Sequence, residues 1–103
     1  MRQQNLAITL CFFALNAFAH DDLISDLKKK QPKVIRELID RRIGCNHWTG
    51  ENPYDSERRQ QINSALKALK CKQLDKDEAA ARRRFVKRPD TLKALQVAKE
   101  TVY

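Results

Sequence analysis

Turn-forming residues are scarce in this sequence, which has two glycines and three prolines among 103 residues. An all-β sandwich or barrel needs turn residues about every 8 to 12 positions, and a nucleotide-binding α/β domain needs a glycine-rich loop. Both folds are therefore disfavoured. Hydrophobic residues make up 42% and charged residues 33% of the chain, as is usual for globular domains. The sequence predicts an all-α fold, a small bundle of about four to five short helices.

The N-terminal segment has the features of an export signal. Arg2 supplies a positive charge, the run Leu6 to Leu15 is apolar except for Thr9, and Ala17 and Ala19 form a small-x-small cleavage site. The apolar run is about half the roughly 20 residues that span a bilayer. These features predict a signal peptide at residues 1–19.

The mature chain is then a single helical domain at residues 20–103, without a transmembrane anchor. Its expected location is the periplasm of a Gram-negative envelope or the medium. A lipoprotein acylated at Cys11 is the alternative, but Leu10 is bulkier than the small residue usually found before such a cysteine.

The cysteine count changes with this cleavage. Cys11 leaves with the signal peptide, and Cys45 and Cys71 remain. An even pair in an oxidising compartment predicts one disulfide, whose closed loop would contribute about 3 to 4 kcal/mol of stability. Two free buried thiols are the alternative.

Apolar spacing predicts helices separated by short interruptions. The first covers residues 21–30. The second begins at Pro32 and ends at Gly44, and the third follows an N-cap at Asp55 and ends near Cys71. The disulfide would join the C-terminal ends of the second and third helices, so we expect the core between these two.

Two further helices are expected in the C-terminal third. Asp75 and Glu78 have the spacing of a capping box that opens the fourth helix, which Pro89 closes. Asp90 is the expected N-cap of the fifth helix. That helix would turn its apolar residues inward, namely Leu92, Leu95, Ala98 and Val102.

Residues 44–55 form a predicted loop of unusual composition. It contains the only tryptophan, both glycines and a histidine, and its candidate binding residues are His47, Trp48, Glu51, Tyr54 and Asp55. Loops on a rigid scaffold commonly carry function. In the competing interpretation Trp48 and Tyr54 cover the end of the core, His47 bonds to Glu51, and Asp55 caps a helix.

A catalytic or metal function has weaker support. His47 with Glu51 or Asp55 would suit acid–base chemistry, but the sequence offers no convincing nucleophile. No cofactor and no structural metal site are expected, because Cys45, His47 and the distant Cys71 do not supply four zinc ligands. After cleavage, an N-terminal His20 could chelate copper or nickel.

Positive charge is concentrated in two runs, and the formal net charge is +8. The first run is Lys28, Lys29, Lys30 and Lys33, and the second is Arg82, Arg83, Arg84, Lys87 and Arg88. These runs are typical either of solvated helix ends or of a surface for an acidic protein or an anionic envelope component. Arg83 and Arg84 are therefore added to the candidate binding residues. Export argues against a nucleic-acid partner.

The pattern Cys45-x-His47-Trp48-x-Gly50-Glu51-x-x-Tyr54-Asp55-x-x-Arg58, followed by Leu69-x-Cys71-x-x-Leu74-x-x-Asp77, resembles a family of small exported proteobacterial proteins without an established activity. The resemblance adds Arg58 to the candidate residues. By architecture alone the chain is also similar to small disulfide-bearing immunity proteins that protect bacterial envelopes from secreted amidases. The sequence thus predicts a non-enzymatic binding or inhibitor module for an acidic protein or envelope partner.

Overall fold

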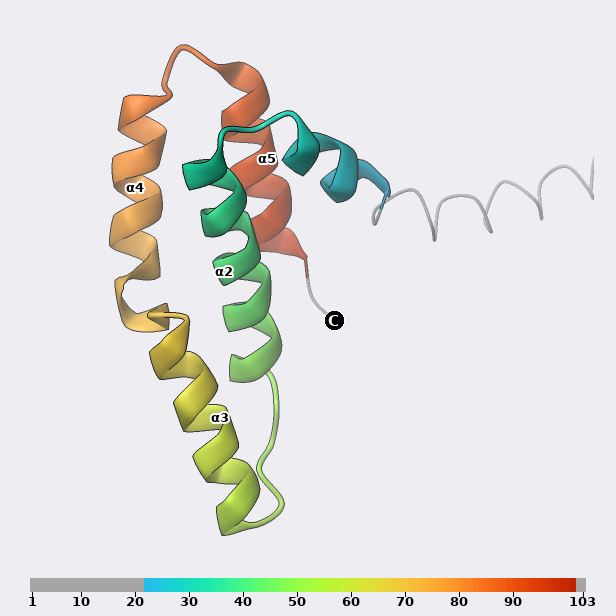
Figure 1. Cartoon of the computed structure of the whole chain (residues 1–103), viewed down its shortest axis with the longest axis vertical. Helices are drawn as coiled ribbons and strands as arrows, with labels where there is room; N and C mark the ends of the chain where they lie inside the picture. The colour runs from blue at the N-terminus through green and yellow to red at the C-terminus, as the bar shows by residue number, and fades with distance from the viewer. Residues whose placement is uncertain (1–21, 102–103) are drawn as a thin grey trace, which may run out of the picture.

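The computed structural model describes residues 22–101 and is helical almost throughout (Figure 1). A short helical segment at residues 22–29 precedes the remaining elements, which are α2 (Lys33–Thr49), α3 (Ser56–Ala68), the 3₁₀ turn η1 (Cys71–Gln73), α4 (Leu74–Arg84) and α5 (Pro89–Glu100). No strand occurs between residues 22 and 101, which confirms the all-α fold. The predicted signal peptide at residues 1–19, together with Cys11, His20 and Val102, lies outside the described residues.

The hydrophobic core lies where α2 packs against α4 and α5. Ile35 and Ile39 of α2 and Leu95 of α5 are completely buried. Ala94 and Ala98 are also completely buried, and their small side chains allow α5 to approach α2 closely. Each large apolar side chain in this core contributes about 1.5 to 3 kcal/mol. The expectation of a core between the second and third helices is wrong, because the residues of that core come mainly from α2, α4 and α5.

The start of α5 is tied to the turn before α2 by buried polar groups. The Thr91 hydroxyl donates a 2.6 Å hydrogen bond to the Gln31 side-chain oxygen, and the Gln31 amide donates to Asp90 at 3.3 Å. Pro89 occupies the first turn of α5 and does not close α4, which ends at Arg84. The prediction that Asp90 caps α5 is therefore wrong. Asp90 lies within the first turn of that helix.

Gly44 does not end α2, contrary to the sequence-based expectation. The helix continues to Thr49. A Cβ atom at Gly44 would lie 2.9 Å from Cδ1 of Leu69 at the end of α3, so the glycine makes room for this leucine. The connection to α3 is consequently limited to residues 50–55, and His47 and Trp48 belong to the last turns of α2.

Asp75 and Glu78 do not form a capping box, because α4 already begins at Leu74. Both carboxylates instead bind Arg42 of α2. The Arg42 Nε donates to Glu78 at 3.0 Å, and its Nη2 donates to Asp75 at 2.5 Å. The Glu78 side chain is only 5% exposed, so this ion pair joins α2 to α4 inside the protein. The hydrogen bond from Arg42 lowers the pKa of Asp75.

The predicted disulfide between Cys45 and Cys71 is confirmed. It encloses residues 45–71, which we call the arm, and the rest of the described chain is the body. In Figure 1 the arm extends away from the body, with α3 lying beyond α4. Apart from Cys45, Ile62 is the only buried residue of the arm. None of the helices within residues 22–101 combines the length and apolar character needed to cross a bilayer.

Candidate functional site

Three of the candidate binding residues meet near the free end of the arm. The Nη2 group of Arg58 donates to both carboxylate oxygens of Glu51, at 2.5 and 2.6 Å. The guanidinium carbon of Arg58 also lies 5.1 Å from the centre of the Trp48 ring, which is a cation–π contact. The hydrogen bond to Glu51 raises the pKa of Arg58 above its already high value. Arg58 therefore links the end of α2, the connecting loop and the first turn of α3.

His47 and Glu51, considered from the sequence as an acid–base pair, lie close together without a hydrogen bond. The His47 Nε2 lies 4.0 Å from the nearer Glu51 oxygen, which is longer than a hydrogen bond. Both oxygens of Glu51 are already held by Arg58. The imidazole instead packs edge-on against Trp48, with the ring centres 5.3 Å apart. Its side chain remains 44% exposed, so it is not buried in the scaffold either.

Asp55 is an N-cap, as predicted. Its carboxylate accepts a 2.7 Å hydrogen bond from the backbone N–H of Arg58 at the start of α3. This bond satisfies a helix N-terminal donor and fixes the place where the loop enters the helix. Asp55 therefore acts within the scaffold and is not directed at His47.

Tyr54 projects into solvent, with 81% of its surface exposed. The interpretation in which Tyr54 covers the end of the core is wrong. Trp48, by contrast, is half-buried and lies beside Arg58. The two aromatic residues of the candidate site thus have different roles, since one supports the loop and the other is presented on it.

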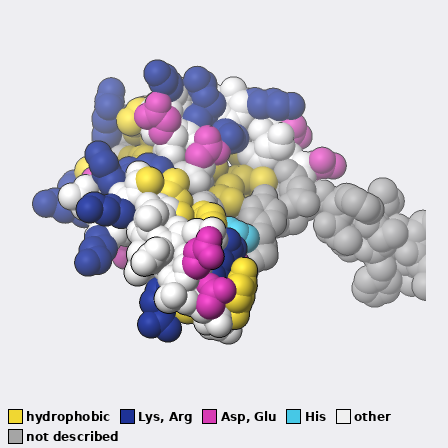
Figure 2. Space-filling view, turned by 60° about the horizontal axis from the view of Figure 1, so that its bottom comes forward, with side chains coloured by type: hydrophobic (Ala, Val, Ile, Leu, Met, Phe, Trp, Pro, Cys, Tyr) yellow, Lys and Arg dark blue, Asp and Glu magenta, His cyan; other side chains and the backbone are white. Residues whose placement is uncertain are grey.

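The tip of the arm carries a small excess of acidic side chains, because Arg58 and Arg59 offset part of their charge. Glu51, Asp55 and Glu57 lie in or next to the loop, and Figure 2 shows acidic side chains gathered on the part of the molecule nearest the viewer. Lysine and arginine side chains lie mostly around this region in that view. Asp55 and Glu57 also complement the positive end of the α3 dipole. The tip therefore lacks the strong positive charge from which an acidic partner was expected.

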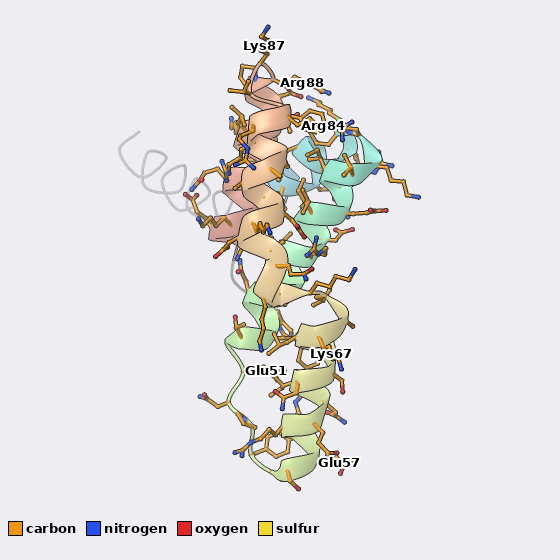
Figure 3. The ribbon with its side chains drawn as sticks, turned by 90° about the vertical axis from the view of Figure 1, so that its left-hand side faces the viewer. Glu51, Glu57, Lys67, Arg84, Lys87 and Arg88 are labelled. Atoms are coloured by element: carbon orange, nitrogen blue, oxygen red, sulfur yellow. A yellow bond between two sulfur atoms is a disulfide. The ribbon has the colours of Figure 1, made fainter. Side chains whose placement is uncertain are left out.

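The arginine-rich helix is not part of the same surface. Figure 3 places Arg84, Lys87 and Arg88 at one end of the molecule and Glu57 at the other. Arg83 lies beside Arg84 in the last turn of α4 and therefore belongs to the basic end as well. The structure thus divides the candidate binding residues between two ends of an elongated molecule.

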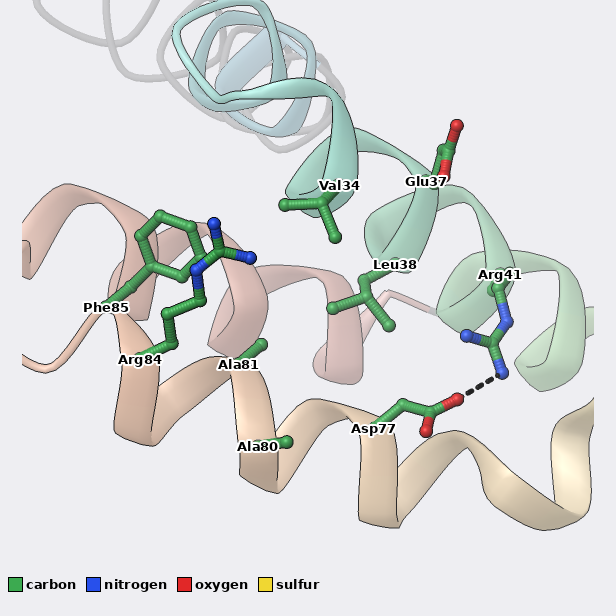
Figure 4. A pocket seen from close by; sticks show the side chains of 9 residues that line it. All are labelled: Val34, Glu37, Leu38, Arg41, Asp77, Ala80, Ala81, Arg84 and Phe85. Atoms are coloured by element: carbon green, nitrogen blue, oxygen red, sulfur yellow. Dashed lines mark ion pairs between the residues drawn. The ribbon is translucent and has the colours of Figure 1, made fainter.

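A groove between α2 and α4 was not predicted from the sequence. It has a volume of about 300 Å³, and its apolar lining residues are Val34, Leu38, Ala80, Ala81 and Phe85. Figure 4 shows the ion pair between Arg41 and Asp77, 3.0 Å apart, at one end of the groove. The alanine run of α4 could have indicated this groove from the sequence, because small side chains leave space between two packed helices.

A second and wider hollow, of about 820 Å³, lies beside the disulfide at the base of the arm. Its lining includes Leu66, Lys67, Lys70 and Lys72, and it was also not predicted. Within residues 22–101, no group of three or more histidine, cysteine or acidic side chains is placed to hold a metal ion.

No protein-family model, no curated protein and no solved structure matches this chain.

Proposed function

We propose that this protein is a non-enzymatic binding module of the inhibitor type. It acts outside the cytoplasm and recognises a partner protein by inserting the tip of its arm into a concave surface. The observation that supports this proposal most directly is an exposed tyrosine on a protruding loop that is fixed at both ends.

The fixed loop supports the proposal because rigid recognition elements lose little conformational entropy on binding. Arg58 joins Glu51 in the loop to Trp48 in α2, and Asp55 caps α3. The disulfide closes the base of the arm. Residues 52–54 are therefore presented on a short segment whose two anchor points are held by side-chain contacts and helix ends.

Tyr54 is the natural anchor of the interaction. Tyrosine is enriched among residues that dominate interface energies, because it buries a large apolar ring and keeps a hydroxyl for hydrogen bonding. An 81% exposed tyrosine makes little contribution to the fold of the free protein. Its burial in a partner would remove this apolar surface from water.

The charge of the tip indicates the chemistry of the partner. Asp55 and Glu57 are exposed beside Tyr54, whereas Glu51 is neutralised by Arg58. A pocket with a neutral or basic rim would suit this surface, because like charges across an interface are repelled. The disulfide is consistent with an oxidising compartment, where the predicted signal peptide would deliver the protein.

The enzymatic alternative has no comparable geometric support. A general base needs to be within hydrogen-bond reach of its partner and its substrate, and His47 has no such bond to Glu51 or Asp55.

The experiment is a comparative capture from extracellular and periplasmic extracts of the producing bacterium, quantified by mass spectrometry. The baits are wild type, Tyr54→Ala and the control Leu23→Ala, which truncates a 38% exposed apolar residue in the body. We expect at least one protein to be retained by wild type and the control, and to bind Tyr54→Ala at least about tenfold less tightly. Equal recovery of every protein by Tyr54→Ala and wild type would contradict the proposal.

A second pair of variants tests whether the loop is preorganised. Glu51→Gln weakens the charged bond to Arg58, whereas the control Gln61→Ala removes a single exposed contact of Arg58. With the captured partner in hand, Glu51→Gln should raise its dissociation constant and the control should leave it nearly unchanged. Equal affinities for the two variants would show that the Glu51–Arg58 bond has no role in recognition.

A further inference from the structure

The turn between α4 and α5 surrounds an exposed apolar side chain with positive charge. Val86 is 62% exposed, and its neighbours along the chain are Arg83, Arg84, Lys87 and Arg88. Arg88 pairs with Asp90 at 3.1 Å, and Arg84 lies over the Phe85 ring. Within residues 22–101, Arg83 and Lys87 make no ion pair with a carboxylate. The turn therefore has cations that are not used by the fold.

Stabilisation of the helix dipole explains only part of this charge. Cations are favourable within the last turn of a helix, and Arg83 and Arg84 occupy that turn of α4. Lys87 and Arg88 follow the end of the helix, where the dipole effect has faded. Val86 adds an exposed apolar side chain between these cations.

The first basic run lies at the same end of the molecule. Lys29, Lys30 and Lys33 flank the turn before α2, and Gln31 in that turn bonds to Thr91 and Asp90 at the start of α5. Figure 1 shows both turns at the same end of the bundle. Val34, which is 42% exposed, adds a second apolar side chain next to this run.

We propose that this basic end binds the surface of a membrane rich in anionic phospholipid. We define the basic end as Lys29, Lys30, Lys33, Val34, Arg83, Arg84, Val86, Lys87 and Arg88. Its cations would lie at the lipid phosphates, and Val86 would enter the boundary of the acyl chains. The attachment is peripheral and depends on charge.

The shape of this end favours a membrane over an acidic protein. Figure 3 shows Lys87 at the extreme end of the molecule, so the charges are on a convex surface. A broad, negatively charged plane can meet such a surface without a matching pocket. The nearby α2–α4 groove is lined by two acidic and two basic side chains, so it has no net charge that would favour an acidic helix.

The placement has a consequence for the proposed function. Because the basic end and the arm tip, marked by Glu57 in Figure 3, lie at opposite ends, attachment to a membrane would leave the arm tip away from the lipid. The inference does not depend on the arm, however, since a different set of residues carries it.

The test is sedimentation of the protein with vesicles of phosphatidylcholine, with and without phosphatidylglycerol. The variant Arg83→Gln, Arg84→Gln, Lys87→Gln removes three charges from the basic end. The control Arg59→Gln, Lys67→Gln, Lys72→Gln removes three exposed charges elsewhere. All proteins carry the same N-terminal residues, established by intact mass, and thermal unfolding by circular dichroism verifies that each is folded.

We expect wild type and the control to bind the anionic vesicles, with little binding to pure phosphatidylcholine. Each lost charge should weaken binding about fivefold, so the basic-end variant should bind about a hundredfold less tightly. Val86→Gln should bind about tenfold less tightly at unchanged charge. High salt should abolish binding, because it shortens the Debye length.

Three results would overturn the inference. One is equal binding of wild type to neutral and anionic vesicles. Another is an equal loss in the two triple variants, which would mean that net charge alone is responsible. The third is binding to a polyglutamate peptide but not to anionic vesicles, which would favour an acidic protein as the partner.

Discussion

The body and the arm are stabilised by different means although α2 runs through both. The body buries large apolar residues such as Ile35, Ile39 and Leu95 completely. In the arm, Ile62 is the only buried residue apart from Cys45. The arm depends instead on the disulfide, on the contacts of Arg58, and on Arg41, whose guanidinium donates to the carbonyl oxygens of Leu69 and Lys70 at 2.9 and 3.2 Å.

This difference shows how a short chain can present a protruding element. An apolar core large enough to stabilise the arm would require further helices to cover it, since small domains bury only a modest fraction of their surface. A covalent bond and a few polar contacts hold the arm without covering its tip. The expected consequence is that changes to the body affect the whole domain, whereas changes to the arm have local effects.

The largest expected effect is in the body, at the pair of Arg42 and Glu78. Arg42→Ala leaves the carboxylate of Glu78, 5% exposed, without its partner. Breaking a buried ion pair costs about 3 to 5 kcal/mol, which is comparable to the whole stability of a small domain. Denaturant unfolding should detect this loss. The double variant Arg42→Leu, Glu78→Leu should recover most of it, and a loss below about 1 kcal/mol in Arg42→Ala would contradict the assignment.

Removal of the disulfide is the next largest effect, and it should distinguish the stability of the arm from that of the body. Replacing Cys45 and Cys71 by alanine should lower the free energy of unfolding by about 3 to 4 kcal/mol. Hydrogen exchange should show that α3 loses its protection before α5, because the arm has almost no buried apolar surface of its own. Simultaneous loss of protection in α3 and α5 would mean that the arm and the body unfold as one unit.

The sequence was sufficient to predict features that depend on a residue type and its position along the chain. The cysteine pair identified the disulfide, and Asp55 was identified as an N-cap by its position before a helical stripe. These features depend on spacing along the chain, which the sequence contains directly.

Prediction from the sequence failed where the meaning of a residue depends on what packs beside it. Glycine is typical of a helix end, but Gly44 lies inside α2. The side chain of Leu69 occupies the space that a Cβ atom at this position would need. Asp75 and Glu78 have capping-box spacing, but Arg42 of another helix binds both. Arg58 was identified only from a resemblance, since nothing in its local sequence indicates that it meets Trp48 and Glu51.

A smaller effect is expected at the N-cap of α3. Asp55→Ala removes the acceptor for the Arg58 backbone N–H and should cost about 1 kcal/mol, whereas Asp55→Asn keeps an acceptor and should cost less. Hydrogen exchange should localise the loss to the first turn of α3 and the adjoining loop. Reduced protection in α5 to the same degree would argue against an arm that responds independently.

The smallest expected effect is a loss of stability at acid pH. The hydrogen bond from Arg42 lowers the pKa of Asp75. For Asp90, burial alone would raise the pKa, but the bonds from Arg88 and Gln31, the charge of Arg88 and the Thr91 backbone together lower it. A carboxyl group whose pKa is lowered in the folded state stabilises the protein at pH values above the ordinary carboxyl pKa of 3.8. This contribution is lost as the pH falls from about 4 towards the folded-state pKa values.

Asp75 and Asp90 both lie in the body, so we expect acid to destabilise the body before the arm. The free energy of unfolding should be nearly constant above about pH 5 and decrease below about pH 4, with an uptake of fewer than two protons from these groups. The variant Asp75→Asn, Asp90→Asn should be less stable at neutral pH and should depend less on pH in the acid range. An unchanged pH dependence in this variant would show that other carboxylates, including those of the arm, determine the acid sensitivity of the protein.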